Sequence, residues 1–387
     1  MHLAEPSWMT EEHEMLRESV VKFIADEIAP HYEDWEAAGI VPREVWRKLG
    51  AQGLLAPDMP EEYGGAGGAF GHLAVILAEF ARQGYAVFAG SMLGVHSGIA
   101  NHYILNHGSE EQKRRYLPGM ASGETVTAIA MTEPAAGSDL QAVQTVAERD
   151  GNGYILNGSK TFISNGQNCD MVIVVAKTDR SVAGSKGTSL LLVDADADGF
   201  ARGRNLEKIG LHSADTSELF FDNVRVDGDA VLGAEHGGFG VLMGELPRER
   251  LTLAIGSLGA IEGALGWTID YIRERQAFGQ PLASFQNSRF KIAEMVTEAR
   301  ALRAFIDDCT VSLSAGALDT ATASMAKLKS TELQGEIVDG CVQLFGGYGY
   351  MREFPISRAF VDARVQRIYG GTSEIMKEII ARDVLGR

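Results

Sequence analysis

The chain has few cysteines, and none is spaced as a metal or redox motif. Only Cys169, Cys309 and Cys341 occur among its 387 residues. An odd number of scattered cysteines argues against a disulfide framework and indicates a reducing compartment. A catalytic cysteine is one alternative, but a small buried hydrophobic role is commoner for a free cysteine. We therefore expect all three to be buried.

Positive charge is also scarce. The sequence has 35 Lys and Arg against 52 Asp and Glu, a formal net charge of -17. Nucleic-acid-binding proteins need a basic footprint, and anionic membranes attract basic surfaces, so this balance argues against both kinds of partner. If the substrate is an anion, a few locally placed cations must bind it.

Long apolar runs are missing too. No run reaches transmembrane length, and the stretch MHLAEPSWMTEEHEML lacks the charged-then-apolar pattern of a secretion signal. A hydrophobic content of 45% with 22% charged residues is ordinary for a globular protein, here of two or three domains. We expect a cytoplasmic protein without membrane insertion, or a matrix protein whose targeting peptide is absent from this chain.

Common nucleotide motifs are absent. The glycine runs GGAGG and FGGYGY do not follow a strand as GxGxxG, and no GxxxxGK[ST] occurs, which argues against a Rossmann site or a P-loop. DADADG matches half of a calcium loop, but its twelfth position is Asn205 rather than Glu. His96, His102 and His107 are spaced six and five apart, which does not suit metal ligation from one helix face. We predict no metal site.

Apolar periodicity divides the chain into three parts. Up to residue 123, apolar residues recur at helical spacing, as after the Thr10 cap. From residue 124, short runs such as DMVIVVAKTD and TSLLLVDAD are separated by turn signals without intervening helices, which indicates an antiparallel sheet. Helical spacing returns after residue 235, as in a helix bundle.

We therefore predict an α+β multidomain fold. It has an N-terminal helical domain (1–123), a middle antiparallel β-sandwich or barrel domain (124–235) and a C-terminal four-helix bundle (236–387). Within it, GYILNGSKTFISNG should form a hairpin, because Asn-Gly favours a tight turn. SEEQKRRYLPGMASG should form a short capped helix ended by its proline and glycine, and another helix should begin at Pro247, where proline suits the first turn.

Two polar stretches in the middle part suit a ligand. AMTEPAAGSD combines free backbone amides with the hydroxyls of Thr132 and Ser138, which suits a polar planar ring or a phosphate, although a tight polar turn is equally compatible. In FISNG, Phe162 and Ser164 share one strand face, so a ring stacked on Phe162 could receive a hydrogen bond from Ser164. The alternative for FISNG is an ordinary hairpin strand.

Three further stretches lie in the helical part. RERQAFGQPLASFQ places Arg275 before Phe278 at a helix end, which suits phosphate binding. QLFGGYGYMREFP has glycines that allow close approach to a ligand, and Gln343 offers amide hydrogen bonds. RIYGGTSEI is typical of a loop that opens a helix at a Thr372 cap, yet nothing before Glu374 in it can accept a proton.

Together, these stretches and the three-part organisation resemble the acyl-CoA dehydrogenase family of flavoenzymes. The resemblance covers residues from about Thr10 to Arg382, and MTEPAAGSD, QLFGGYGY and IYGGTSEI are highly specific to the family. Three stretches resemble its long-chain branch in particular, namely HSGIANHYILNHGSEEQ, DTATASMAK and YGGTSEIMKE. The resemblance implies FAD-dependent α,β-dehydrogenation of a fatty acyl-CoA to the trans-2-enoyl-CoA. It also implies electron-transferring flavoprotein as acceptor and a homotetramer.

The resemblance implies roles for individual residues. The flavin would contact Met131, Thr132, Ser138, Phe162 in place of the usual Trp, Ser164 in place of Thr, Thr372 and Glu374. The flavin of a neighbouring subunit would contact Arg275, Phe278, Gln286, Gln343, Gly346 and Gly347. The acyl-CoA would contact Ser138, Arg250 and Gly371.

The catalytic base is displaced from its commonest position. In most of the family a Glu directly follows Tyr in the loop before the last helix, and here Gly370 occupies that position. The long-chain and isovaleryl branches carry the Glu on a helix, at the position that matches Glu249. The Gly370 amide and a flavin ribityl hydroxyl would stabilise the enolate. Glu245 is a weaker candidate because it precedes the predicted helix, and a surface acid is the alternative for Glu249.

Substrate length stays open. The segment near Ser91 and Met92 should border the acyl tail, and its sequence differs from that of the long-chain branch. An oxygen-using flavin oxidase or monooxygenase on the same fold, or a non-enzymatic acyl-CoA or flavin-binding scaffold, are the alternative functions.

Overall fold

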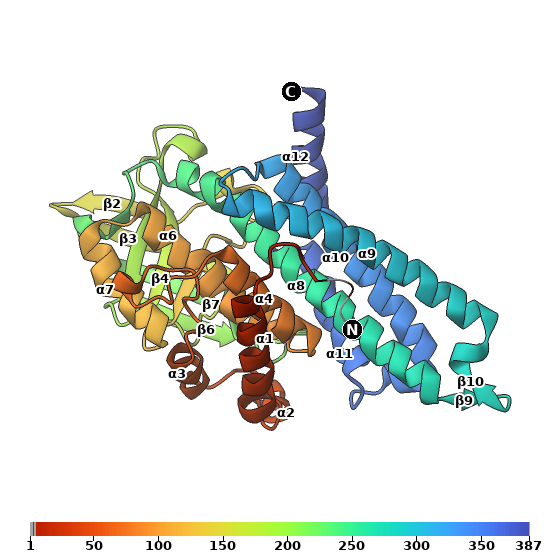
Figure 1. Cartoon of the computed structure of the whole chain (residues 1–387). Helices are drawn as coiled ribbons and strands as arrows, with labels where there is room; N and C mark the ends of the chain where they lie inside the picture. Colours follow the sequence, from red (N-terminus) through yellow and green to blue (C-terminus); the bar gives the residue numbers. More distant parts are fainter. Residues whose placement is uncertain (1–2, 4, 387) are drawn as a thin grey trace.

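The computed structural model describes Leu3 and residues 5–386. The N-terminal helices and the C-terminal bundle pack side by side, the β domain lies at one end, and α12 projects from the bundle (Figure 1). The predicted domain ends at residues 1 and 387 lie outside the described residues. The boundaries at 123/124 and 235/236 stay predictions.

The N-terminal part is helical, as predicted. Its elements are α1 (Glu11–Phe23), η1 (Ile24–Ile28), α2 (Tyr32–Ala38), α3 (Arg43–Ala51), η2 (Glu61–Tyr63), α4 (Phe70–Arg82), η3 (Phe88–Met92), α5 (Leu93–Val95), η4 (His96–Ala100), α6 (Asn101–His107) and α7 (Glu110–Ser122). Of the proline and glycine predicted to end the helix in SEEQKRRYLPGMASG, Pro118 lies inside α7, whereas α7 does end at a glycine, with Gly123 as its αL cap. Leu117 and Met120 are fully buried, and their packing outweighs the hydrogen bond that proline removes.

The middle part is one curled sheet. Its strands are β1 (Thr127–Ala130), β2 (Val146–Asp150), β3 (Gly153–Ser164), β4 (Met171–Lys177), β5 (Thr188–Asp194), β6 (Phe200–Asn205), β7 (Thr216–Val226) and β8 (Val231–Leu232), with short helical turns η5 (Leu140–Ala142), η6 (Gly184–Lys186) and η7 (Gly228–Ala230). The order is β6-β7-β3-β2-β4-β5-β8, with β1 beside β4. Most pairs are antiparallel, as predicted, but β1 and one residue of β2 pair in parallel with β4.

The hairpin predicted over residues 153–166 does not form. Asn157 and Gly158 lie inside β3, at a register shift against β7, and the turn that joins β2 to β3 lies at Gly151 and the next residue. A Cβ at Gly158 would lie 2.5 Å from the Thr145 Oγ1 atom. This glycine therefore serves a close approach between neighbouring segments rather than a turn.

The C-terminal part is a helix bundle. Its elements are α8 (Gly238–Glu274), β9 (Gln276–Ala277), β10 (Gln280–Pro281), η8 (Leu282–Ser284), α9 (Gln286–Ser314), α10 (Thr320–Phe345), η9 (Gly346–Tyr350), α11 (Pro355–Ala363), η10 (Arg364–Arg367) and α12 (Ser373–Leu385). The helix predicted to begin at Pro247 begins at Gly238 instead, with proline inside it. Among the described residues, α8 alone is long and apolar enough to cross a membrane by length and composition, contrary to our expectation. However, 83% of that window is buried inside the protein.

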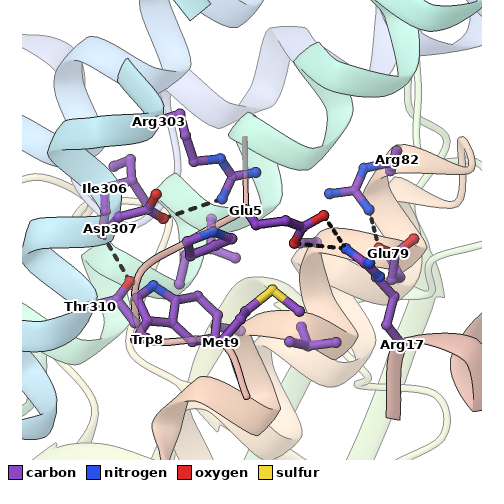
Figure 2. A pocket seen from close by; sticks show the side chains of 15 residues that line it. Glu5, Trp8, Met9, Arg17, Glu79, Arg82, Arg303, Ile306, Asp307 and Thr310 are labelled. Atoms are coloured by element: carbon purple, nitrogen blue, oxygen red, sulfur yellow. Dashed lines mark hydrogen bonds and ion pairs between the residues drawn. The ribbon is translucent and has the colours of Figure 1, made fainter. Parts of the chain in front are cut away.

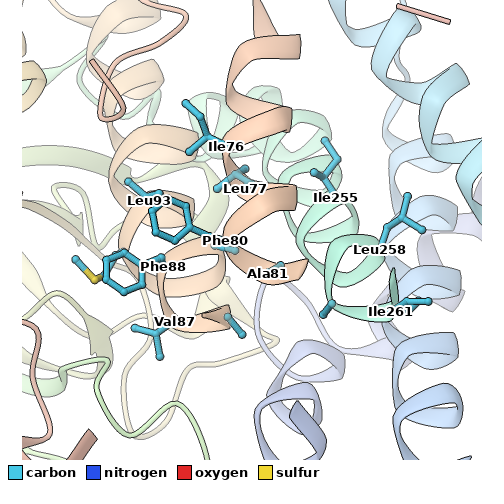
Figure 3. Close-up of a cluster of buried hydrophobic side chains, with 14 of the residues drawn as sticks. Ile76, Leu77, Phe80, Ala81, Val87, Phe88, Leu93, Ile255, Leu258 and Ile261 are labelled. Atoms are coloured by element: carbon cyan, nitrogen blue, oxygen red, sulfur yellow. The ribbon is translucent and has the colours of Figure 1, made fainter. Parts of the chain in front are cut away.

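A shared hydrophobic core fixes α8 against the N-terminal helices. Leu77 and Phe80 of α4 pack in the same cluster as Ile255 and Leu258 of α8, with Phe88 of η3 beside them (Figure 3). This packing outweighs the helix-breaking tendency of proline in α8. A second cluster joins α6 and α7 to one face of β4, and a third fills the space between β4 and β3–β7.

Candidate active site

Glu249 is buried in the first half of α8, only 6% exposed. Burial raises the pKa of its carboxyl to about 7, and the nearby Glu245 also raises it, whereas a hydrogen bond from Tyr103 and the charge of Arg250 lower it. A carboxyl with this pKa is about half ionised at neutral pH and can act as a general base there. The surface-acid alternative for Glu249 does not fit this burial.

Tyr103 of α6 is the direct partner of Glu249. Its hydroxyl donates to the Glu249 Oε1 atom over 2.6 Å, and its side chain is fully buried. No local pattern marks Tyr103 in the sequence, because it occupies one apolar-facing position of a helix and its partner is 146 residues away.

Glu245 also lies within α8, so the reason given above for rejecting it is wrong. It is 8% exposed, and its Oε1 atom is 2.9 Å from His107 Nε2 and 3.0 Å from Asn106 Nδ2. Both partners lie on α6, so this carboxylate is occupied in tying α8 to α6.

Gly370 and Gly371 form the loop that approaches the Glu249 face of α8. A Cβ at Gly370 would lie 2.4 Å from Leu253 Cδ1, one helical turn beyond Glu249. Both glycines have positive φ, +62° and +94°, a conformation that favours glycine. In the part of the chain that the structure describes, neither glycine amide donates a hydrogen bond to another protein group. Thr372 caps α12 over 3.3 Å, as predicted.

Arg250 points to α10 rather than to solvent. It is 3% exposed, and its Nη1 atom donates to Ser324 Oγ over 3.0 Å, while its Nε is buried without a partner among the described residues. Burial lowers the pKa of the guanidinium, and the charge of Glu249 raises it. An anionic or carbonyl group of a ligand would satisfy this Nε.

A buried ion pair shapes the loop AMTEPAAGSD. Glu133 accepts from Lys160 Nζ at 2.8 Å and from the amides of Gln144 and Thr145, and Lys160 also donates to the Met131 carbonyl at 3.1 Å. Burial lowers the pKa of Lys160 to about 8, against the opposing charge of Glu133. This pair holds the predicted flavin loop in place, but no sequence motif marks it, because Glu133 and Lys160 are 27 residues apart.

The predicted flavin residues of the middle domain lie around this loop. The Thr161 amide donates to the Thr132 carbonyl over 2.9 Å, which brings β3 against the loop. Phe162 is 68% exposed with φ +60°, Ser164 is half-buried, and Ser138 is exposed. An exposed aromatic ring at this backbone angle offers its face to a planar ring such as isoalloxazine, and the exposed Ser138 offers a hydroxyl. The residues present therefore fit a flavin.

The second predicted flavin group lies elsewhere in the chain. The β9–β10 hairpin is at the far end of α8 from the β domain (Figure 1). There Phe278 is 97% exposed, and the Arg275 guanidinium lies 5.2 Å from the centre of the Tyr348 ring. Gln286, Gln343, Gly346 and Gly347 are exposed in the same region of the bundle. One copy of the chain therefore does not bring the two groups together.

The cysteines and histidines that the sequence did not favour as catalytic or metal-binding residues have structural roles. All three cysteines are buried, as predicted, and burial raises the pKa of their thiols to about 11 to 12. His96 bonds Met120 O, and His102 bonds Asp58. No group of His, Cys, Asp and Glu that could hold a metal occurs in residue 3 or residues 5–386.

A small cavity has no predicted site residue in its lining. It holds about 30 Å³, room for roughly one water, between the segment Glu5–Met9 and helices α4, α8 and α9 (Figure 2). Its polar lining includes Glu79, Arg82, Arg303 and Asp307. These side chains take part in ion pairs within the protein.

Three family models together match most of the chain. They are the acyl-CoA dehydrogenase N-terminal domain over residues 10–124, the middle domain over 128–224 and the C-terminal domain over 236–385. The chain belongs to the acyl-CoA dehydrogenase family. Both the resemblance and the three-part fold predicted above are thereby confirmed.

Known acyl-CoA dehydrogenases match over nearly the whole length. The mitochondrial long-chain specific acyl-CoA dehydrogenase of Sus scrofa is 49% identical over 97% of this chain and 86% of its own. The acyl-CoA dehydrogenase structure from Geobacillus kaustophilus has a TM-score of 0.95 and 44% identity, covering 98% of this chain and all of that one. The glutaryl-CoA dehydrogenase of Mycobacterium smegmatis, solved in complex with FADH2, has a TM-score of 0.91 and 29% identity over 98% and 96% of the two chains. This protein is accordingly an oxidoreductase that acts on a CH–CH group.

Proposed function

We propose that this enzyme converts a fatty acyl-CoA to its trans-2-enoyl-CoA, with Glu249 removing the α proton. The observation that carries the proposal is the buried Glu249 carboxyl, whose pKa is about 7, on the helix face that meets the Gly370–Gly371 loop. The free amides of that loop can donate to the thioester oxygen as negative charge develops on it. Arg250, with its unpartnered Nε, would border the acyl-CoA.

The cofactor that we propose is FAD. Met131, Thr132, Ser138, Phe162 and Ser164 would hold its ring system, and Thr372 and Glu374 would complete the site. When bound, FAD supplies the acceptor for the β hydrogen, which leaves as hydride. The exposed Phe162 ring and the M. smegmatis relative solved with FADH2 support this assignment.

We further propose a homotetramer that passes electrons to electron-transferring flavoprotein. Arg275 and Phe278 lie in the β9–β10 region, at the far end of α8 from the β domain (Figure 1), and Gly346 and Gly347 lie in η9, whose Tyr348 contacts Arg275. This separation from the flavin residues of the middle domain supports a contribution to the flavin of a second copy. The acceptor follows from the family resemblance. The cytoplasmic location stays a prediction.

The function is tested by anaerobic titration of the purified flavoprotein with acyl-CoAs from C4 to C18, branched ones included. We expect loss of flavin absorbance with at least one saturated acyl-CoA and formation of the 2-enoyl product in equal amount. Reoxidation by electron-transferring flavoprotein should be much faster than reoxidation by air. A protein that binds acyl-CoA without reducing its flavin, or that prefers oxygen, would refute the proposal.

Tyr103→Phe should move the pH dependence of catalysis. Because the Tyr103 hydroxyl lowers the pKa of Glu249, its removal should raise that pKa above about 7. The base works when ionised, so the rate of flavin reduction rises with pH through this pKa, and its inflection should move to higher pH in the variant. The measurement is the anaerobic reduction rate from pH 5.5 to 9.5.

Tyr116→Phe is the matched control for this prediction. The Tyr116 hydroxyl bonds Asp194 at 3.1 Å, on β5, outside the predicted site. Its profile should coincide with wild type. An inflection for Tyr103→Phe at or below the wild-type value would contradict the assigned role of the hydrogen bond.

A further inference from the structure

One buried lysine, Lys327 of α10, is absent from the function assigned so far. Its side chain is fully buried, and its ammonium donates to the Gly371 carbonyl over 2.6 Å. Within the described chain it forms no direct ion pair, and the negative charges that act on it, those of Glu332 and Glu374, do so from farther away. A buried charge without a directly paired counter-ion is expensive, so its short hydrogen bond to Gly371 needs an explanation.

The acceptor of that bond belongs to the loop with the free amides. Gly370 and Gly371 are consecutive glycines at positive φ, and glycine loses the most conformational freedom when it is ordered. A contact from outside the loop therefore helps to offset the cost of holding it in one conformation. The Thr372 cap orders the residues that follow, and the Tyr369 hydroxyl, 3.0 Å from Gln366 Oε1, orders those that precede. Lys327 holds the glycines between them.

The same face of α10 also contacts α8 beside the base. Ser324 lies three residues before Lys327, and residues at this spacing are neighbours on a helix surface. Ser324 Oγ accepts from Arg250 Nη1 at 3.0 Å and donates to the Thr320 carbonyl at 2.6 Å. Arg250 is the residue directly after Glu249, so this bond ties the helix turn that carries the base to α10.

We propose that Lys327 and Ser324 are positioning residues that set the Gly370–Gly371 amides and Glu249 at a fixed separation. Lys327 holds the loop, Ser324 holds Arg250, and α10 is the common support. This inference rests on the proposed function, in which Glu249 takes the α proton and the loop amides stabilise the thioester oxygen. Burial and the charge of Arg250 lower the pKa of Lys327 to about 8, against the charges of Glu332 and Glu374, which agrees with a buried site that holds two cations.

The test isolates the proton-transfer half of the reaction. The probe is an acyl-CoA in which sulfur replaces the β carbon, so that it has acidic α hydrogens but no β hydrogen to lose. FAD-loaded Lys327→Met, Ser324→Ala and Lys329→Met are incubated with it in D2O, and deuterium at Cα is followed by mass spectrometry. Lys329 is the matched control, because it lies on the same helix, is half exposed and pairs with Glu298 at 3.1 Å on the surface.

We expect α-deuterium exchange to fall by about 10- to 100-fold in Lys327→Met, because small misplacement of catalytic groups has effects of that order. Ser324→Ala should lose less, roughly 3- to 10-fold, since it loosens one neutral hydrogen bond. The dissociation constant of the probe, the FAD content and the thermal midpoint should change little, and Lys329→Met should match wild type. Exchange at the wild-type rate in FAD-loaded Lys327→Met would overturn the proposal.

A purely structural role gives a different pattern. With a purely structural role, Lys327→Met would have a lower thermal midpoint or FAD content, but its folded, FAD-loaded fraction would exchange deuterium at the wild-type rate. That result would also overturn the proposal. If Lys327→Met does not fold, normal exchange by Ser324→Ala overturns it. Failure of the proposed function is separable, because it would appear as undiminished exchange in Glu249→Gln.

Discussion

Glu249→Gln should reduce the anaerobic rate of flavin reduction by acyl-CoA by about 10²- to 10⁴-fold, the usual contribution of a positioned general base. Gln has nearly the same shape and can still accept the hydrogen bond of Tyr103, which now measures 2.6 Å. The substitution therefore removes the proton acceptor and little else. Substrate affinity and FAD content should remain near wild type.

The pH dependence gives a second measure of the same residue. With a pKa of about 7, the wild-type carboxyl is mostly protonated at pH 6 and mostly ionised at pH 8. The rate of flavin reduction in wild type should therefore rise through pH 7 as the base ionises. The residual rate of Glu249→Gln should lack this rise.

Glu245→Gln is the matched control for the base. Glu245 is buried on the same helix, one turn before Glu249, and is engaged by His107 and Asn106. Its charge raises the pKa of Glu249, so the variant should show an inflection at lower pH and a rate at pH 9 within about 3-fold of wild type. Loss of activity in Glu245→Gln, with activity retained in Glu249→Gln, would reverse the assignment.

Glu262→Ala should destabilise the folded protein by about 3–5 kcal/mol, the range seen when one partner of a buried ion pair is removed. Glu262 of α8 is fully buried. Its carboxylate accepts hydrogen bonds from Arg82 of α4, whose Nε atom lies 2.8 Å away, and from Arg303 of α9. Figure 2 shows both arginines beside the small cavity. The substitution leaves two guanidiniums partly unpaired inside the core.

The Glu262 carboxylate links α4, α8 and α9, and its contribution to stability should depend on pH. Burial would raise the pKa of Glu262, but Arg303 and Arg82 outweigh burial and lower it. A lowered folded-state pKa means that the contribution is present above the usual Glu range and is lost as pH falls. The wild-type advantage over Glu262→Ala in urea midpoint should therefore shrink on acidification.

An exposed ion pair is the control for this stability prediction. Glu298 pairs with Lys329 at 3.1 Å with both side chains about half exposed, so Glu298→Ala should change stability by about 0–1 kcal/mol. Both variants are compared by urea midpoint and thermal midpoint of the FAD-loaded protein, because several packed domains need not unfold in one step. Equal midpoints for Glu262→Ala and wild type would show that the buried cluster contributes nothing.

Local signals in the sequence were sufficient where the chemistry is local. The Thr372 cap, the buried cysteines and the three-part order of helix, sheet and helix follow from spacing and composition, and the structure confirms them. Glu249 was identified as the candidate base because the family resemblance pointed to an acid on a helix and to the absence of the usual Glu at Gly370. Its burial and its raised pKa, however, depend on helices that are distant in the chain.

Local signals failed where packing opposes them. Asn157 and Gly158 suggest a turn, yet they lie inside β3, because neighbouring strands cover both sides of the chain there. Pro247 suggests a helix start, yet α8 continues through it, because α4, α9 and α10 bury most of its length. In both places the free energy of tertiary packing exceeds a local preference of a few kcal/mol.

The sequence by itself determined the family, the order of the three parts and the identity of the candidate base. Only the tertiary structure decided what surrounds that base: Tyr103 from α6, Leu253 against Gly370, and Ser324 and Lys327 from α10. Apart from Ser324 and Lys327, which are neighbours on α10, these groups come from distant parts of the chain, and pairing between distant residues leaves no periodic trace in one sequence. Their proximity arises because long helices pack through buried side chains, which places polar groups together wherever the helix faces meet.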